Sequence, residues 1–264
     1  MRIDPLSAAL HRGAGEHGPL ILMYHSVQLG AAAPTWTWAV SLRRFLSQLD
    51  FLAAEGYATP TMAELVATPA RHARTVVITF DDGYEDNLAA CEALEKRGMR
   101  ATWFIVAGSL GSSPAWPADG RPTGKILNPH QLRQMQAAGM EIGSHSMRHQ
   151  RLPALADDQL ARDLRESREL LETVTARPVS SFAYPYGAWD ARCAEAVKLA
   201  GYQAACTTRT GWALKDGDPY RLRRLTITNT DTTSSFARKL FFGSHDVAWT
   251  DVGRYAFRRL GLAK

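Results

Sequence analysis

The chain has 264 residues, of which 45% are hydrophobic, and it carries a formal net charge of +5. A chain of this length and composition can bury a large core, and the modest charge gives no indication of a nucleic-acid partner. Its three cysteines lack Cys-x-x-Cys spacing, which argues against both a disulfide framework and a sulfur-ligated zinc site.

The first apolar segment, Leu20–Tyr24, is too short for the core of a signal peptide or for a membrane span. The sequence as given therefore predicts a soluble, cytoplasmic protein. An export signal upstream of this sequence is the alternative.

Strands and helices are predicted to alternate nearly from end to end. The strands are near-continuous apolar runs, which are typical of parallel strands buried on both faces. They are expected at Leu20–Tyr24, Thr75–Phe80, Ala101–Val106, Met140–Ser144, Val179–Tyr184, Gln203–Thr207 and Leu222–Thr228.

The helices between these strands are indicated by capping residues and by apolar side chains that recur on one face. Asn128 followed by Pro129, for example, is a favourable cap and first turn. In chain order the helices are expected from Ser41 to Gly56, Asp86 to Gly98, Asn128 to Gly139, Asp157 to Glu172, Asp190 to Gly201 and Ser234 to Phe242.

Repeated strand–helix units predict an α/β fold in which a parallel sheet has helices outside it. About seven parallel strands indicate a distorted (β/α) barrel, with a doubly wound flat sheet as the alternative. No Ser/Pro/Gly-rich linker interrupts the pattern, so we expect a single domain over residues 1–264, with residues 243–264 as a peripheral C-terminal extension.

Two polar motifs follow predicted strands, Asp81-Asp82-Gly83 and His145-Ser146-Met147-Arg148-His149. The side chains of neighbouring acids at a strand end diverge, so one can bind a metal while the other faces an attacking water. The two histidines can converge on one ion if their segment is helical or tightly looped. Together the motifs offer the set that metal-assisted hydrolysis needs.

Each motif alone has a simpler interpretation, an Asp-Gly corner in a solvated turn or a pair of surface histidines. Both motifs, however, fall at the carboxyl ends of predicted strands. In barrels that edge is the functional face, so the metal interpretation is favoured.

Together with a third segment, Phe182–Gly187 (Phe-Ala-Tyr-Pro-Tyr-Gly), the two motifs resemble the signature of NodB-type polysaccharide deacetylases, carbohydrate esterase family four. The resemblance covers at least residues 75–208 and implies a distorted (β/α) barrel. The site residues that it implies are Asp82, His145 and His149 as metal ligands, Asp81 as general base, and Pro185 and Tyr186 at the substrate, with the Tyr186 backbone N–H as oxyanion donor.

The sequence departs from this family pattern at two places. Ala183 stands where the family usually has an arginine that orients the catalytic carboxylate, so no group is yet identified that orients Asp81. The late Leu-x-His block that supplies the general acid is also missing, because the corresponding segment reads Leu225-Thr226-Ile227-Thr228. His245 is the only histidine after His149, and it follows no clear strand.

The missing histidine has a counterpart near the N-terminus, where His25 follows the apolar strand Leu20–Tyr24. This segment is similar to the early Tyr-His block in the circularly permuted branch of the family, which includes poly-N-acetylglucosamine deacetylases. A strand moved from the end of a barrel to its beginning keeps its place in space. His25 is therefore the predicted general acid.

The resemblance implies the removal of N-acetyl groups from a glycan that contains amino sugars, with one divalent metal. Two nitrogens and one oxygen favour zinc, and cobalt, nickel or manganese are alternatives. Trp116 lies in a Gly/Ser/Pro-rich loop, residues 109–127, and is a candidate for stacking on the substrate, with anchoring of the loop as its alternative role.

Three other functions are kept as alternatives. Two histidines and a carboxylate also bind iron in non-haem oxygenases, although the order Asp, His, His on an α/β scaffold disfavours this class. A non-catalytic glycan-binding relative would be consistent with Ala183. The same hydrolysis could instead act on a lipid-linked sugar or on a small non-sugar amide.

Aromatic residues lie among basic residues near the C-terminus and could contact a membrane surface. Packing against the barrel is favoured, because large exposed apolar patches are uncommon. The aromatic residues are Phe241, Phe242, Trp249, Tyr255 and Phe257.

Overall fold

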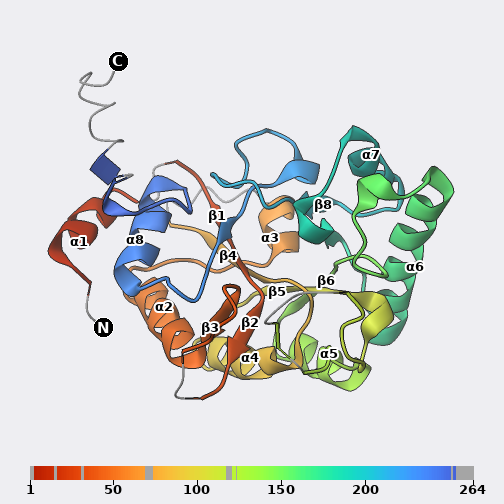
Figure 1. Ribbon diagram of the computed structural model, residues 1–264, viewed down its shortest axis with the longest axis horizontal. Coiled ribbons are helices and arrows are strands. Elements are labelled where there is room, and N and C mark those ends of the chain that lie inside the picture. The colour runs from red at the N-terminus through yellow and green to blue at the C-terminus, as the bar shows by residue number, and fades with distance from the viewer. Residues whose placement is uncertain are drawn as a thin grey trace.

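The computed structural model describes residues 3–14, 17–30, 33–68, 74–116, 121–122, 124–250 and 252–253. Among these residues, seven parallel strands form one sheet in the order β8-β7-β6-β5-β4-β1-β9. The strands are β1 (Leu20–Tyr24), β4 (Val76–Phe80), β5 (Thr102–Ile105), β6 (Glu141–Ser144), β7 (Ser181–Ala183), β8 (Ala204–Cys206) and β9 (Leu225–Thr226). The sheet is a curled half-barrel, which confirms the predicted distorted (β/α) barrel (Figure 1).

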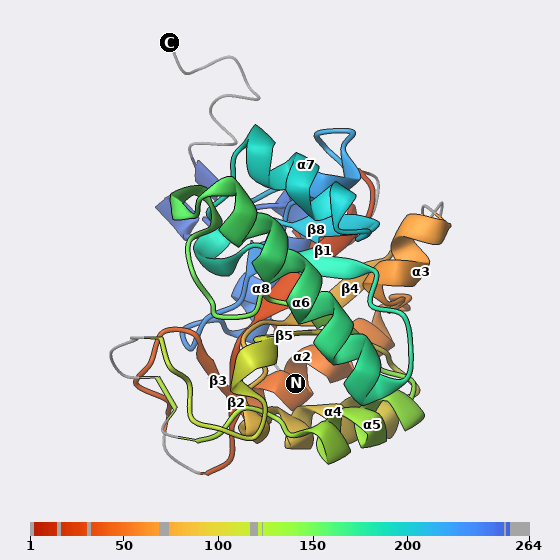
Figure 2. The same cartoon turned by 90° about the vertical axis from the view of Figure 1, so that its right-hand side faces the viewer.

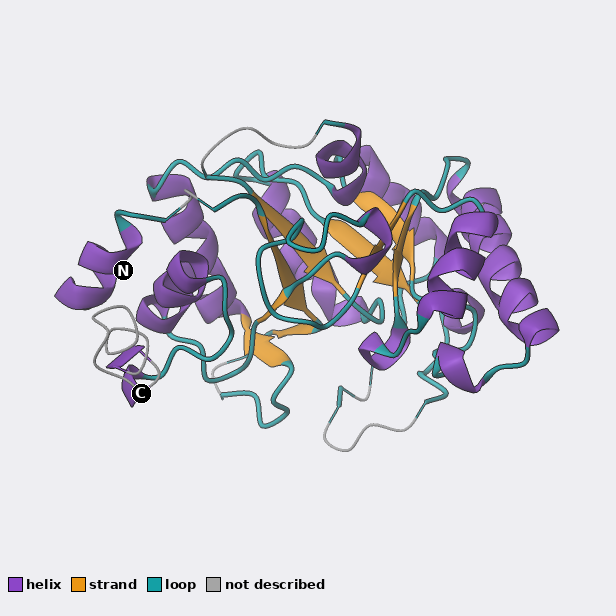
Figure 3. Cartoon of the chain, turned by 90° about the horizontal axis from the view of Figure 1, so that it is seen from above, coloured by secondary structure: helices purple, strands orange, loops and turns teal. Residues whose placement is uncertain are grey.

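Helices surround the sheet, as the view from above shows (Figure 3). The helices of the described residues are α1 (Pro5–His11), α2 (Leu42–Ala54), α3 (Met62–Ala67), α4 (Leu88–Glu95), α5 (Pro129–Ala137), α6 (Asp157–Thr175), α7 (Ala191–Leu199) and α8 (Thr233–Phe242). The long helix α6 runs across one side of the barrel, above α5 (Figure 2).

Several predicted helix starts are confirmed by their caps. The Ser41 side chain accepts a hydrogen bond from the backbone N–H of Arg44, and Asp190 caps α7 in the same way. Asn128 accepts from His130 and Gln131, and the Gln131 side chain returns a bond to the Asn128 backbone. These bonds satisfy N–H groups that have no partner within the helix.

The helix expected from Asp86 begins slightly later than predicted. A single 3₁₀ turn, Glu85–Asn87, comes first, and α4 follows from Leu88. Asp86 accepts a hydrogen bond from Ser26, and the Asn87 amide contacts the backbone of Val27 and His25. The acid predicted as a helix start therefore holds the segment that follows β1.

Four short elements were not predicted. They are α1, α3 and a separate pair of parallel strands, β2 (Ser26–Gln28) and β3 (Ala39–Ser41). A signal for α1 was present, because Asp4 caps the helix and Pro5 occupies its first turn. The strands β2 and β3 are too short to show a period in the sequence.

The last strand is shorter than the predicted Leu222–Thr228. Only Leu225 and Thr226 pair with β1, whereas Leu222 forms a bridge to Cys206 of β8. The segment changes partner between these points, so that it joins the two edges of the curled sheet instead of running on as one straight strand.

The strand register brings the predicted reactive residues to one edge. Tyr24 is paired with Phe80, so His25 and Asp81 follow neighbouring strands at the same level. Ser144, which precedes His145, pairs with Phe182 of β7. Because all of these strands are parallel, their carboxyl ends share the same edge of the barrel.

The helix α8 packs beside α1 at one end of the molecule (Figure 1). Ser234 and Arg238 of α8 hydrogen-bond to the backbone of Asp4 and to the Ser7 hydroxyl. Beyond α8, the Arg238 guanidinium lies 4.4 Å from the ring centre of Trp249. Most of the predicted C-terminal extension, including Tyr255 and Phe257, lies outside the described residues.

None of the helices in the described part of the chain is both long and apolar enough to cross a bilayer.

We expect the substitution Gly143→Ala to destabilise the fold. A Cβ atom at Gly143, in β6, would lie 2.6 Å from the Ser181 hydroxyl and 2.7 Å from the Phe104 ring. Overpacking of this kind costs about 1–3 kcal/mol of unfolding free energy, which urea denaturation measures. The matched control is Gly124→Ala, since a Cβ there meets nothing within 4 Å. Equal unfolding free energies for the two variants would contradict the packing argument.

Candidate active site

Asp82, His145 and His149 converge at the carboxyl edge of the sheet, and all three are buried. Asp82 Oδ1 lies 3.2 Å from His149 Nε2 and 3.6 Å from His145 Nε2. One ligand atom from each residue lies within 4.8 Å of the other two. The structure thus brings the three predicted metal ligands together.

The backbone reaches this arrangement through left-handed conformations rather than through a helix. Asp82, Ser146 and His149 have φ values of 71°, 71° and 55°. The Ser146 hydroxyl accepts from the His149 backbone N–H, and the Ser144 hydroxyl accepts from that of Ser146. Such conformations are costly for residues other than glycine and are commonly found at functional sites.

The protonation of His145 follows from its surroundings. Its Nδ1 lies 2.7 Å from the carbonyl oxygen of Ala183, which can only accept a hydrogen bond, so Nδ1 carries the proton. Burial lowers the pKa of His145 to about 4, which keeps the ring neutral at pH 7. Its Nε2 lone pair therefore faces the Asp82 carboxylate.

Two acceptors that face each other in a buried site repel unless a cation lies between them. The arrangement of His145 and Asp82 therefore fits a divalent metal, with the Ala183 carbonyl in the orienting position that metal-binding histidines commonly use. Imidazole and carboxylate ligands suit zinc and also other first-row metals.

Asp81, which lines the same cavity as this cluster, is held by Arg224. The two guanidinium Nη atoms donate to Asp81 Oδ1 and Oδ2 at 2.6 and 2.7 Å. Arg224 is fully buried, its Nε donates to the Thr207 carbonyl, and its guanidinium lies over the Phe104 ring. Burial would raise the pKa of Asp81, but Arg224 outweighs burial and holds that pKa below its usual value.

Arg224 thus supplies the orienting group that the sequence analysis left without a candidate. The side chain of Ala183, where the family usually has arginine, belongs to the same buried cluster as Phe104. A signal for Arg224 existed in the sequence, because it interrupts a predicted buried strand. An arginine in such a place needs a carboxylate partner.

His25 lies at the end of β1, beside the strand that carries the two acids. Its ring packs against Trp38 and Trp36, with ring centres 5.4 and 6.0 Å apart. Among the described residues, its buried Nδ1 has no hydrogen-bond partner. Burial lowers the pKa of His25, although the carboxylates of Asp82 and Asp81 act in the opposite direction.

A cavity of about 770 Å³ opens over these groups. It is lined by Asp81, the three metal-site residues and His25, and by four aromatic side chains, Trp36, Trp38, Trp116 and Tyr186. Ligand sites commonly occupy about 300–1,000 Å³. The two tryptophans that precede α2 were not singled out from the sequence, where they lie in an irregular segment.

Trp116 and Tyr186 flank His149, with ring centres 4.6 and 4.5 Å from that imidazole. Tyr186 has a left-handed φ of 58° and exposes 43% of its surface, and the guanidinium of Arg151 lies 4.5 Å from its ring centre. Pro185 begins the 3₁₀ turn Pro185–Gly187 that contains Tyr186. The Pro185 side chain is buried and does not line the cavity. Part of the Trp116 loop, residues 117–120 and 123, lies outside the described residues.

Comparison with known proteins decides the family. The sequence profile described as polysaccharide deacetylase matches residues 68–205, just over half of the chain. The chain belongs to the polysaccharide deacetylase family. Each of the three motifs contributes residues to the lining of the cavity, namely Asp81 and Asp82, His145 and His149, and Tyr186 and Gly187.

Relatives match over most of the chain. YxkH of Bacillus subtilis, named as a candidate polysaccharide deacetylase, is 30% identical over 221 residues, 82% of this chain and 74% of that protein. The poly-beta-1,6-N-acetyl-D-glucosamine N-deacetylase of Staphylococcus epidermidis is 24% identical over 81% of this chain and 80% of its own length. The deacetylase PplD of Streptococcus pyogenes, solved with acetate, has a similar fold: its TM-score is 0.74 at 22% identity, over 84% of this chain and 98% of that chain.

The ion pair between Arg224 and Asp81 can be tested by removing the charge of Arg224 and measuring the unfolding free energy. We expect Arg224→Met to lose about 3–5 kcal/mol of unfolding free energy, because Asp81 is left as a buried, unpaired charge. In an Asp81→Asn background the same substitution should cost clearly less. Urea denaturation of the four proteins in this cycle measures the coupling, and purely additive losses would contradict the pairing.

The metal set can be tested by binding alone. We expect His149→Ala to weaken Zn²⁺ binding by at least about 10–100-fold, the range known even for loss of residues that only orient a ligand. Isothermal titration calorimetry at pH 7 measures the affinity. His130→Ala is the control, since His130 is exposed at the start of α5. Unchanged affinity in His149→Ala would exclude this histidine as a ligand.

Proposed function

We propose that the chain is a metal-dependent hydrolase that removes N-acetyl groups from a glycan containing amino sugars. The observation that carries this proposal is the placement of Asp81, ionised and clamped by Arg224, beside the Asp82, His145 and His149 cluster in one cavity. Family membership and the names of the relatives support the same chemistry.

Asp82, His145 and His149 would hold the metal, for which zinc is our first choice, with cobalt, nickel or manganese as substitutes. A divalent ion bound there would polarise the acetamido carbonyl and lower the pKa of a water molecule.

Asp81 is proposed as the general base that accepts the proton of the attacking water. Its lowered pKa keeps it ionised at neutral pH. Arg224 takes one lone pair on each carboxylate oxygen, and a carboxylate oxygen has two, so Asp81 can still accept the proton. The guanidinium thus fixes the direction in which the base acts.

His25 is proposed as the general acid that protonates the leaving amine. The pairing of β1 with β4 places it beside Asp81, at the opposite end of the sequence from the family's usual acid. Burial lowers the pKa of His25, whereas the Asp82 and Asp81 carboxylates act in the opposite direction, toward the imidazolium that a general acid needs. This arrangement supports assignment to the circularly permuted branch of the family.

The oxyanion would be stabilised in part by the backbone N–H of Tyr186. This residue lies in the 3₁₀ turn Pro185–Gly187, has a left-handed φ of 58° and lines the cavity. A donor of this kind is typically worth about 10²–10³ in rate.

The substrate that the site supports best is an N-acetylglucosamine-type sugar within an oligosaccharide. The aromatic walls formed by Trp36, Trp38, Trp116 and Tyr186 suit the apolar faces of sugar rings, with Trp116 as a stacking residue. The lack of an arginine at position 183 had favoured a non-catalytic relative. Because Arg224 pairs with Asp81, this lack no longer favours that alternative.

Asp81→Asn should abolish acetate release and still bind metal. The amide cannot accept the proton from water, whereas Asp82 and the two histidines are unchanged. Acetate release from a chito-oligosaccharide and Zn²⁺ titration together check this outcome, with His130→Ala as the control. Full activity of Asp81→Asn would rule out Asp81 as the base.

His25→Ala should slow acetate release by about 10²–10⁴-fold, the usual contribution of acid–base assistance. The loss should appear in kcat, because the proton is needed as the C–N bond breaks. Steady-state kinetics on the same oligosaccharide measure it. A His25→Ala enzyme with the kcat of the unaltered chain would contradict the assignment of His25 and, with it, the permuted arrangement.

A further inference from the structure

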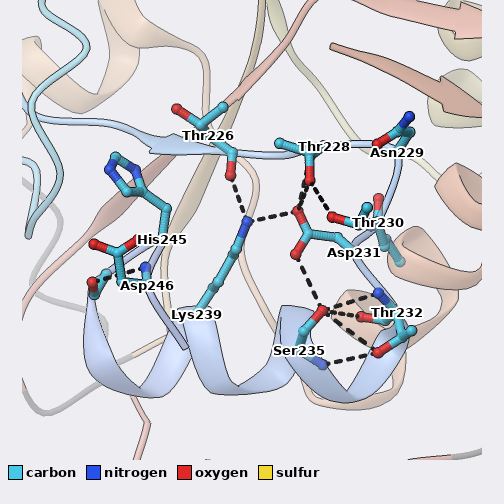
Figure 4. A network of polar contacts seen from close by, with 12 residues as sticks. Thr226, Thr228, Asn229, Thr230, Asp231, Thr232, Ser235, Lys239, His245 and Asp246 are labelled. Atoms are coloured by element: carbon cyan, nitrogen blue, oxygen red, sulfur yellow. Dashed lines mark hydrogen bonds and ion pairs between the residues drawn. The ribbon is translucent and has the colours of Figure 1, made fainter. Parts of the chain in front are cut away.

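The lining of the cavity extends beyond the catalytic residues to a polar network on and beside α8, whose contacts Figure 4 shows from close by. We name this part the α8 chamber. Its walls come from the end of β9, the loop that follows it, α8 and the loop beyond α8. The residues are Thr226, Thr228, Thr230, Asp231, Ser235, Lys239, His245 and Asp246.

A buried ion pair forms the centre of this chamber. Lys239 Nζ lies 2.6 Å from Asp231 Oδ2 and donates to the Thr226 carbonyl at 2.8 Å, and both charged side chains are 5% exposed. Asp231 also accepts from the backbone and hydroxyl of Thr228. The Asp231 carboxylate therefore has several hydrogen-bond partners. The Asp231–Lys239 ion pair is rigid and has no net charge.

Several polar groups in the α8 chamber retain unused hydrogen-bonding capacity. The Lys239 ammonium has three N–H groups, of which two are engaged. The Thr226 hydroxyl lines the cavity and has no hydrogen-bond partner among the described residues, and Asp246 is exposed to solvent. His245 Nδ1 is buried and also lacks a partner there. A buried atom without a partner, such as His245 Nδ1, needs a hydrogen bond, and a ligand in the cavity can supply it.

The charges in this chamber select the kind of ligand. Lys239 and Asp231 cancel, and Arg238 is engaged by the Val247 carbonyl, the Ser7 hydroxyl and Asp4. A phosphate or carboxylate would approach Asp231 and Asp246, and an ammonium group would approach Lys239. Hydroxyl groups both donate and accept, and they match a wall that mixes hydrogen-bond donors and acceptors in this way.

We propose that the α8 chamber is a second sugar subsite, which binds a neutral, hydroxyl-rich sugar ring linked to the N-acetylated one. This inference rests on the proposed deacetylase function. It names His245 and Thr226 as specificity-determining residues, neither of which has a part in the hydrolysis. It also assigns a role to His245, the late histidine that does not supply the general acid.

The test compares three neutral substrates that each carry one N-acetyl group. They are N-acetylglucosamine and two β-linked dimers that join N-acetylglucosamine to glucose in either order. For the unaltered, zinc-loaded chain, we expect kcat/KM to be at least tenfold higher for one dimer than for the monomer. The dimer with the higher kcat/KM shows on which side of the reacting sugar the α8 chamber binds the second ring.

The dimer-to-monomer ratio of kcat/KM is then measured in His245→Ala and Thr226→Val. We expect the ratio to fall about tenfold, toward one, in both variants and to stay at its original value in His130→Ala. Thermal melting accompanies each measurement. A variant that melts earlier but keeps the ratio would show a structural role only and would overturn the subsite.

Other outcomes separate this inference from the function on which it rests. Acetate release with no preference for either dimer overturns the subsite and leaves the deacetylase function intact. No acetate release from any of the three substrates, or from longer N-acetylated oligomers, overturns the proposed function itself. A dimer with glucuronic acid in place of glucose that reacts faster than the glucose dimer overturns the neutral character of the chamber.

Discussion

The buried pair of Asp81 and Arg224 is the constraint on which the site depends. Its members are 143 positions apart in the sequence, yet two short hydrogen bonds join them inside the barrel. A buried ion pair is rarely a net source of stability, because desolvation offsets much of the attraction. The pair is therefore better explained by a role of Asp81 that requires an ionised carboxylate in a fixed direction than by a gain in stability. The partner that achieves this comes from the segment that joins the two edges of the sheet.

The parallel register makes the rest of the site a consequence of the fold. His25, Asp81, Asp82 and His145 all follow strands whose carboxyl ends meet at one edge. Order along the chain does not matter for this placement, which is why His25, after the first strand, can lie beside Asp81, which follows the neighbouring strand of the sheet. Left-handed backbone at Asp82 and His149 then turns the ligands toward one point.

The cavity divides into two regions of different character. Near Asp82, His145 and His149 its walls are aromatic, and they suit the apolar faces of rings. Beside α8 the walls are hydroxyls and a neutral ion pair, which suit hydrogen bonding to a sugar. Since α8 packs on α1, both ends of the described chain contribute to the position of the second region.

The sequence by itself determined the strand–helix alternation, the barrel class and the residues Asp81, Asp82, His145 and His149, because apolar runs and polar strand ends are local signals. His25 came from the resemblance of its segment to the family's permuted branch. Only the tertiary structure decided that Arg224 orients Asp81, that Trp36 and Trp38 enclose His25, and that Lys239 and Asp231 border the same cavity. These contacts join segments far apart in the chain or lie in irregular loops. No periodicity or spacing in one sequence encodes which of many charged side chains will face each other once the sheet has curled.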